Sequence, residues 1–363
     1  MSIPPDRRSA TPTQKVLLCG DASRHRNTFC AGVARDGSDL ARRGLGVAAG
    51  LLLDRALGEP PDAWHPVAWF GTAMGRVEHL TYADRRTAGA GYAVVGAGLG
   101  ALAGAALARL GRAGLATAVG VASAGRMLRH TSRQVEARLV AGDLEGARER
   151  LPWLVGRDPR GLDEAGVSAA VAESLAENTV DAVVAPAVWG LLAGAPGVLV
   201  HRAVNTMDAM VGHRSPRYAR FGTVAARADD VMAWVPARVF AGLVALDTGL
   251  LTLVGALRGL PPVGPSARTV LATVRRDAPA HPSPNAGVAE SAVAGALGVE
   301  LGGPLVYAGR REERPTLGSG PRPGPADIAR ARRLVDRVEG AVVLLAVALW
   351  AADRDRASRR GSR

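Results

Sequence analysis

Long stretches without a charged residue constrain this chain more than any other feature. Residues 87–108 carry no Asp, Glu, Lys or Arg. As a helix rising 1.5 Å per residue they would cover roughly 33 Å, enough for the roughly 30 Å hydrocarbon layer of a bilayer. Residues 182–200 are also uncharged, although Pro186 and Pro196 interrupt them, and residues 239–257 contain a single charge. Shorter apolar stretches occupy residues 45–53, 113–125 and 340–352. The pattern predicts an all-α, polytopic membrane helix bundle with about four to five transmembrane helices and helical polar loops.

The apolar residues are mostly small. The chain is 48% hydrophobic but only 4% aromatic, and it contains 45 glycines. Membrane helices associate through close backbone contact, because the bilayer supplies no hydrophobic drive between them, and small residues permit that contact. Gly96, Gly100 and Gly104 form such a stripe on one helix face. A water-soluble all-α protein with Ala-rich helices is the alternative.

Charge and lysine content weigh against two function classes. The formal net charge is +12, but the arginines are spread over the polar connections and stacking aromatics are scarce, so we expect no nucleic-acid partner. Arginines that face anionic lipid and anionic substrates explain the charge equally well. The only lysine, Lys15, has no glycine-rich loop before it, and this excludes a P-loop for ATP.

The chain divides into three parts. Residues 1–43 are polar, rich in arginine and aperiodic. They lack an apolar core of signal-peptide length, so we predict a disordered extension. Residues 44–353 contain the apolar stretches and form the predicted membrane domain, and residues 354–363 form a basic tail. Arginines flank nearly every apolar stretch on both sides, so their distribution does not orient the helices in the membrane.

Three carboxylates precede the uncharged stretch at residues 182–200. On a helix, Glu173, Glu177 and Asp181 follow at i, i+4 and i+8 and line one face, with Asn178 beside them. Like charges at this spacing destabilise a helix. A cation between them would remove that cost, and Mg²⁺ takes one or two carboxylates together with phosphate oxygens. A solvated acidic face is the alternative.

Residues 201–218 combine an amide, a carboxylate and several arginines. Asn205 and Asp208 stand at i and i+3. The arginines around them include Arg202, Arg214 and Arg217. Guanidinium groups bind oxyanions through paired hydrogen bonds, so this segment predicts a phosphate or polyphosphate site with its metal. An ordinary basic loop of a membrane protein is the alternative.

A proline-rich loop forms the third polar segment. In His281-Pro-Ser-Pro-Asn285 each proline disfavours α conformation in the residue before it, so we expect an extended loop and then a helix from about Val288. His281, Ser283 and Asn285 are thereby held beside a helix N-terminus, which attracts anions. The pair Asp229–Asp230 is a weaker candidate, for a helix cap or a metal ligand.

Four segments, in this order, resemble the CobD/CbiB family of adenosylcobinamide-phosphate synthases. They are LLLDRALGEPPDAWHPVAWFG from residue 51, ESLAENTVDAVVAPAVWGLLAGAPG from residue 173, HRAVNTMDAMVGHRSPRYARFGTVAARADDVMAWVPARV from residue 201 and HPSPNAGVAESAVAGALGVELGG from residue 281. The resemblance covers about residues 45–352. It departs from common family residues at His201, His213, Arg214 and Val288.

The resemblance implies an integral membrane ligase that depends on ATP and Mg²⁺. Such an enzyme joins adenosylcobyric acid to (R)-1-amino-2-propanol phosphate, or to the free amino alcohol, through an amide bond. A carboxylate becomes an acyl donor once it is phosphorylated, so we expect ATP to form an acyl phosphate that the amine attacks. Under this hypothesis the metal ligands are Glu173, Glu177, Asp181 and Asp208, and the nucleotide and phosphate contacts are Arg202, Arg214, Arg217 and Asn178. His281 takes a proton from the attacking ammonium group, and Asn205 and Asn285 orient substrate carbonyl groups.

The resemblance further implies a multi-pass protein of the cell membrane, in contact with lipid, with its reactive loops on the cytoplasmic side. Contact with other cobalamin-assembly enzymes is compatible with it. The competing hypothesis is a non-catalytic transporter or a subunit of a transport complex, in which intramembrane polar groups such as Asp247 would line a path.

Overall fold

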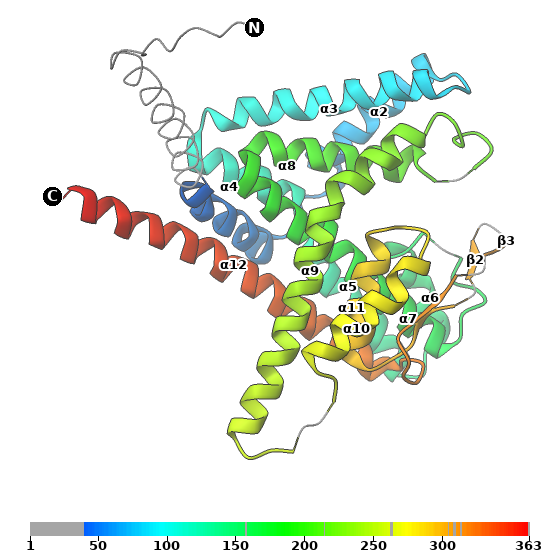
Figure 1. The fold of residues 1–363 in the computed structure, drawn as a ribbon. Coiled ribbons are helices and arrows are strands. Elements are labelled where there is room, and N and C mark those ends of the chain that lie inside the picture. Colours follow the sequence, from blue (N-terminus) through cyan, green and yellow to red (C-terminus); the bar gives the residue numbers. More distant parts are fainter. Residues whose placement is uncertain are drawn as a thin grey trace, which may run out of the picture.

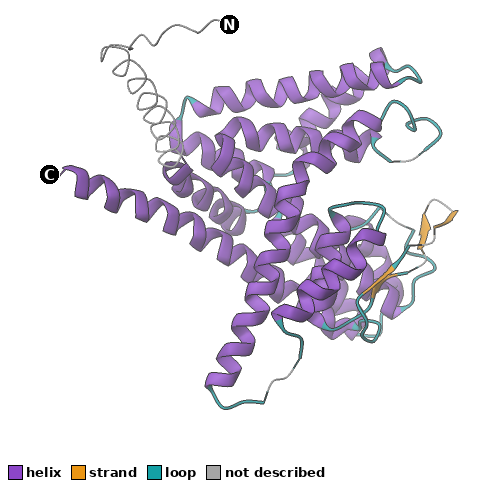
Figure 2. Ribbon diagram, viewed as in Figure 1, coloured by secondary structure: helices purple, strands orange, loops and turns teal. Residues whose placement is uncertain are grey.

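The computed structural model describes residues 40–361 except 157, 214, 262–263, 304, 308–309 and 313. A first helix covers residues 40–57. The helices that follow are α2 (Pro66–Thr81), α3 (Arg86–Ala108), α4 (Gly111–Ala122), α5 (Gly125–Val140), α6 (Leu144–Arg150), α7 (Glu164–Thr179), α8 (Ala185–Val211), α9 (Thr223–Leu257), α10 (Ala267–Asp277), α11 (Ala286–Leu297) and α12 (Pro325–Gly361). Four short helical turns connect them: η2 (Asp62–Trp64), η3 (Leu151–Trp153), η4 (Val180–Val184) and η5 (Ala278–Ala280). The all-α prediction is confirmed (Figure 2).

Strands in the described chain are few and short. β1 (Leu301–Gly302) pairs antiparallel with β4 (Thr316–Leu317), and β2 (Leu305–Tyr307) pairs antiparallel with β3 (Arg310–Glu312). β1 and β4 lie beside α7 and α11, and β2 and β3 project at the right edge of the molecule in Figure 1. The two strand pairs lie outside the helical core and do not form a separate layer.

Three helical stretches of the described chain are long and apolar enough to cross a membrane: Arg86–Ala108, Glu164–Val211 and Thr223–Leu257. They contain the three long uncharged or nearly uncharged stretches of the sequence, as expected for an all-α membrane bundle. The shorter stretches at residues 45–53 and 340–352 lie within the first helix and α12. A total of about four to five crossings therefore stays a prediction.

The glycine stripe of α3 forms a backbone contact with α8. The two helices pack along each other (Figure 1). A β-carbon added at Gly100 would lie 2.7 Å from the Leu199 carbonyl oxygen, and one at Gly104 would overlap Pro196. Larger residues would force the helices apart, so the stripe acts as predicted for membrane helices that associate through small residues.

Helix α8 is folded back on itself. Gly194 has a φ of 66° and a ψ of −157°, a conformation that favours glycine. It separates a first arm, residues 185–193, from a second arm, residues 195–211. A β-carbon on Gly197 would lie 2.9 Å from the Trp189 carbonyl oxygen, whereas residues eight apart in a straight helix are separated by about 12 Å. The uncharged stretch that the sequence shows as one unit is therefore a helical hairpin.

The second half of the molecule is organised around α7 and α11. Leu175 and Ala176 of α7 and Ala289 and Val293 of α11 are fully buried. Helices α5, α9, α10 and α12 pack around them. Small residues on both central helices allow this close packing, and it fixes the C-terminal end of α7 and the N-terminal end of α11, where the polar residues of interest begin.

The predicted division into three parts stays a prediction. The proposed N-terminal extension falls outside the described residues except for residues 40–43, which belong to the first helix. The basic tail, residues 354–363, continues α12 as a helix to Gly361. Arg42 and Asp353 approach to 4.0 Å, so the start of the first helix lies beside the end of α12, at the left of Figure 1.

Candidate active site

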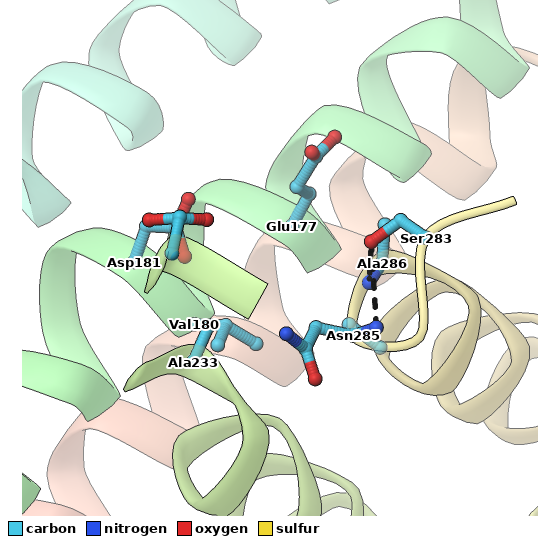
Figure 3. A pocket seen from close by; sticks show the side chains of 9 residues that line it. Glu177, Val180, Asp181, Ala233, Ser283, Asn285 and Ala286 are labelled. Atoms are coloured by element: carbon cyan, nitrogen blue, oxygen red, sulfur yellow. Dashed lines mark hydrogen bonds between the residues drawn. The ribbon is translucent and has the colours of Figure 1, made fainter. Parts of the chain in front are cut away.

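A polar pocket lies where α7, α9 and the start of α11 meet (Figure 3). Its cavity volume is about 30 Å³, and it opens to solvent. Its lining residues are Glu177, Val180, Asp181, Asp229, Ala233, Ser283, Asn285, Ala286 and Ala289. Residues 180–184 form a π-helical turn at this point, a local widening that often marks functional sites. Two of the predicted metal ligands, Glu177 and Asp181, and one predicted catalytic residue, Asn285, thus share one pocket.

An amide links two carboxylates of this pocket. Nδ2 of Asn205, from the second arm of α8, donates to Oδ2 of Asp181 at 3.0 Å and to Oδ1 of Asp229 at 3.3 Å. The hydrogen-bond partner that Asp181 and Asp229 share is therefore neutral, and their two carboxyl groups lie close together. Repulsion between carboxylates at such short range is unfavourable unless a cation joins them, so the arrangement is suited to bind one.

Arg202 and Asp208 flank the amide on the same arm. Nη1 of Arg202 donates to Oδ1 of Asn205 at 3.4 Å, and the buried Nε of Arg202 has no hydrogen-bond partner in the described chain. The guanidinium group also interacts electrostatically with Asp181 and with Glu59, which belongs to the first of the four family-like segments. Asp208 interacts electrostatically with Asp181. Arg202 is thus placed to meet an anion beside the carboxylates.

Asn285 is held at both ends of its amide group. Its Oδ1 accepts from Nη1 of Arg238 at 2.6 Å, and its Nδ2 donates to the Asp230 carbonyl oxygen at 2.7 Å. Arg238 in turn stacks on Trp234, with 4.5 Å between the guanidinium carbon and the ring centroid. These contacts tie the 281–286 loop to α9, the helix that carries Asp229. Asn285 therefore shapes one wall of the pocket.

His281 is buried behind that wall and is not among the pocket-lining residues. Its Nδ1 accepts from the Ser283 backbone N–H at 3.1 Å, and its Nε2 lies 3.8 Å from Oε2 of Glu290. The Ser283 hydroxyl group in turn accepts from the Ala286 backbone N–H at 3.2 Å. His281 and Ser283 together shape the loop, and a role for His281 as the base stays a prediction.

Two other predicted residues make contacts within the fold. Oε1 of Glu173 accepts from the Gly302 backbone N–H at 2.8 Å, and Glu173 is buried. Nδ2 of Asn178 donates to the carbonyl and hydroxyl oxygens of Ser174. Neither residue lines the pocket. Of the three carboxylates expected on one helical face, Glu177 and Asp181 line the pocket, and Glu173 binds the backbone of β1 instead.

Arg217 lies in a separate cluster, and Arg214 lies outside the described residues. Nη2 of Arg217 donates to Oε1 of Glu78 at 3.1 Å, and its guanidinium carbon lies 4.1 Å from the centre of the Tyr82 ring. The hydrogen bond that Arg217 donates to Glu78 raises the pKa of Arg217, because the carboxylate stabilises the charged form. Glu78 thus compensates the charge of Arg217, and Arg217 does not line the pocket.

Asp229 and Ser283 line the pocket; from the sequence Asp229 was only a weak candidate for a helix cap or a metal ligand, and Ser283 was given no role in the reaction. The signal for Asp229 was the Asp229–Asp230 pair inside an apolar helix, which is costly unless it has a purpose. The signal for Ser283 was its position between two prolines. The sequence does not reveal that α9 crosses the end of α7, so the meeting of Asp229 with Asp181 could not be predicted.

The donor set of the pocket is compatible with Mg²⁺. Among the described residues no three His, Cys, Asp or Glu side chains are arranged to hold a metal ion by themselves. However, Mg²⁺ commonly binds through one or two carboxylates and completes its shell with phosphate oxygens and water. Asp181 and Asp229, which share the Asn205 amide, supply the hard oxygen donors that this mode requires.

Asp247, the residue that a transport path would use, is engaged elsewhere. Its two carboxylate oxygens accept from Nε and Nη2 of Arg337 at 2.7 and 2.9 Å. A bidentate pair of this kind neutralises the carboxylate. Asp247 joins α9 to α12 and gives no support to the transporter hypothesis.

Fold and site together define an all-α membrane bundle with a carboxylate-rich pocket at the junction of its helices. The family model described as CobD/Cbib protein matches residues 47–335, so the chain belongs to the CobD/CbiB family. This confirms the resemblance found in its sequence.

Curated relatives agree with this assignment over most of their length. The cobalamin biosynthesis protein CobD of Mycobacterium tuberculosis is 47% identical over 312 residues, which cover 85% of this chain and 96% of that protein. The protein of the same description from Chromobacterium violaceum is 43% identical, over 79% of this chain and 90% of that one. The one from Geobacter metallireducens is 38% identical, over 85% and 98%. No solved structure matches the chain.

Proposed function

We propose that this chain acts in cobalamin biosynthesis as an ATP-dependent ligase that joins adenosylcobyric acid to (R)-1-amino-2-propanol phosphate or to the free amino alcohol. The observation that carries the proposal is the pocket in which Asp181 and Asp229 share the Asn205 amide beside Arg202. Arg202 and Asn205 lie behind the lining residues and not among them. Adjacent carboxylates with a guanidinium group beside them can bind a metal-bound phosphate and its counter-charges together.

The proposed chemistry has two balanced steps. The substrate carboxylate attacks the γ-phosphorus of ATP, so that a C–O–P bond forms and ADP leaves. The amine then attacks the carbonyl carbon, and the amide forms as inorganic phosphate and a proton leave. Phosphorylation is needed because an ionised carboxylate is a poor acceptor for an amine, and positioning the two reactants supplies much of the rate enhancement.

The residues of the pocket divide this work. Asp181 and Asp229, with Glu177 at the solvent side, would hold Mg²⁺, which supplies charge compensation for the phosphate oxygens. Arg202 would bind phosphate oxygens through its guanidinium group. Asn205 keeps the two aspartates and Arg202 in register, which reduces reorganisation during the reaction.

The test is turnover with purified protein. Protein in detergent or nanodiscs receives adenosylcobyric acid, the amino alcohol phosphate, ATP and Mg²⁺, and mass spectrometry follows the amide product and ADP. Formation of both in equal amounts supports the proposal. The absence of product from a folded protein that binds the corrinoid would overturn it, and a matched sample with a non-hydrolysable ATP analogue controls for contaminating activity.

A further inference from the structure

The helical hairpin of α8 has a consequence for how the chain crosses the membrane. Asp181, just before the first arm, and Asn205, in the second arm, are 24 positions apart but hydrogen-bonded at 3.0 Å. A straight helix would separate them by about 36 Å. α7, η4 and the first arm follow one another as a continuous helical stretch. The chain thus runs towards Gly194 and returns alongside itself.

The tip of the hairpin has the properties of a segment that lies in lipid. Residues 182–200 carry no charge, and Leu192 at the tip is 53% exposed. The break at Gly194 frees backbone carbonyl groups, and Nη1 of Arg43 donates to those of Leu191 and Leu192 at 3.0 and 2.5 Å. Irregular backbone at membrane depth is tolerated where protein groups satisfy it, as the Arg43 side chain does here.

The contacts with α3 show how the second arm is positioned along that helix. Near the hairpin tip, Pro196 lies against Gly104, close to the C-terminal end of α3. At the other end, Phe221 lies against Gly89, and Arg220 pairs with Asp84 at 3.4 Å. The second arm and the loop after it therefore run antiparallel to α3 over nearly its whole length. If α3 crosses the membrane, the second arm crosses it too, in the opposite direction.

Exposed apolar side chains surround this region. On the outer side of α3 they are Val94, Val95, Leu99 and Leu102, each at least 42% exposed. A water-soluble protein rarely leaves such a continuous apolar helix face uncovered. Hydrocarbon is the partner that matches this face, because it needs no specific contact and the face lacks charge.

We propose that residues 164–211 form two membrane legs joined at Gly194, with the hydrocarbon layer of a bilayer as their partner. The segment before α7 and the 212–222 loop then emerge on the same face of the membrane. The turn between α3 and α4 emerges on the opposite face. If residues 182–200 instead crossed the membrane once, the segment before α7 and the 212–222 loop would emerge on opposite faces. This proposal does not depend on the proposed reaction.

The test is labelling of single cysteines with a membrane-impermeant maleimide in sealed vesicles of known orientation. The natural cysteines are first removed as Cys19→Ser and Cys30→Ser. Gly161→Cys lies in the segment before α7, Ala219→Cys in the 212–222 loop and Leu110→Cys between α3 and α4; all three positions are exposed. Gel filtration of each variant confirms that it is folded, and permeabilised vesicles give its maximum labelling.

The expected result is that Gly161→Cys and Ala219→Cys react from the same face and Leu110→Cys reacts from the other. If Gly161→Cys and Ala219→Cys react from opposite faces, residues 182–200 cross once and the proposal is wrong. If all three positions react from one face, α3 does not cross either, and the proposal is equally overturned. Catalytic activity is not a readout, so the ligase proposal can fail without affecting the outcome.

Discussion

Two carboxylate clusters in this protein use similar residues in opposite ways. In the pocket, Asp181 and Asp229 share a neutral amide. The exposed Glu177 lines the same pocket. Where the first helix, α5 and α12 meet, Glu339 forms an ion pair with Arg129, and the two side chains are only 3% and 9% exposed. One cluster joins its carboxyl groups through an amide at an opening, and the other pairs its carboxylates directly with arginines inside the fold.

Further contacts extend the paired cluster. Asp336 accepts from Nη1 of Arg55 at 2.7 Å and lies 3.8 Å from Nη1 of Arg129. Asp54 accepts from the Arg126 backbone N–H at 3.0 Å. Glu339 and Asp336 are thus paired with arginines and join three helices, whereas Oδ1 of Asp54 is buried without a hydrogen-bond partner in the described chain. The difference teaches that function is indicated by the partners of an acidic residue and not by acidity itself.

The largest expected effect comes from breaking the paired cluster. Removal of Arg129 leaves Glu339 buried with the half-exposed Arg55, 3.6 Å away, as its remaining arginine neighbour, and loss of one partner of a buried pair costs roughly 3–5 kcal/mol. Arg129→Met should therefore lower the thermal unfolding midpoint strongly in detergent, as measured by circular dichroism. The double variant Arg129→Met/Glu339→Met removes both charges and should recover much of the loss. An unchanged midpoint in the single variant would show that Arg129 and Glu339 do not form a compensating pair.

The opposite result is expected in the pocket. Asp229→Asn keeps the shape of the side chain but removes a charge that repels Asp181. We expect turnover to fall on the order of 100-fold, as for loss of a metal or phosphate contact, while the unfolding midpoint stays level or rises. Steady-state kinetics and thermal unfolding measure the two effects. Near-normal turnover would remove Asp229 from the proposed site.

A smaller effect should follow from loosening the wall of the pocket. Arg238 positions Asn285 through the 2.6 Å hydrogen bond to its Oδ1, so it acts on the pocket indirectly. Arg238→Met should lower kcat roughly 10-fold, and Arg238→Lys, which can still donate, should restore most of it. Equal losses in both variants would indicate that stacking on Trp234, and not the hydrogen bond, is what matters.

The sequence predicts the membrane bundle well because its signal is local. A charge-free stretch such as residues 87–108 predicts α3 without knowledge of any neighbour, and the glycines of that stretch predict a close helix contact. The reversal of α8 is different. Gly194 is one of several glycines and prolines in its stretch, and none of them alone predicts a hairpin. The turn also depends on the Arg43 side chain and on the packing of α3, which are distant in the sequence.

The site was predictable only in part for a related reason. Glu177 and Asp181 are neighbours on successive turns, so their joint position follows from helical periodicity. Asp229 reaches them through tertiary structure, and His281 turns away from the pocket because it hydrogen-bonds to its own loop. Arg217 was selected for its charge, yet the Glu78 that compensates it lies 139 positions away in the chain.

The smallest effect is expected for a carboxylate whose arginine partner is exposed. Asp277 accepts from Arg276 at 2.6 Å and from the Gly318 backbone N–H at 2.8 Å. The hydrogen bond from Arg276 lowers the pKa of Asp277, so its contribution to stability is present above the ordinary carboxyl pKa of about 4 and is lost as the pH falls through the lower folded value.

Asp277→Asn should therefore cost less than about 1 kcal/mol at neutral pH. The difference from the unaltered protein should shrink as the pH falls below about 4, which unfolding midpoints measured across a pH series will show. A cost as large as that of Arg129→Met would contradict the comparison, since it would mean that pairing with an exposed arginine matters as much as pairing with a buried one. A small cost would place Asp277 with the compensated carboxylates, and with the least important of them, because its partner Arg276 is 56% exposed and water can solvate that partner's charge.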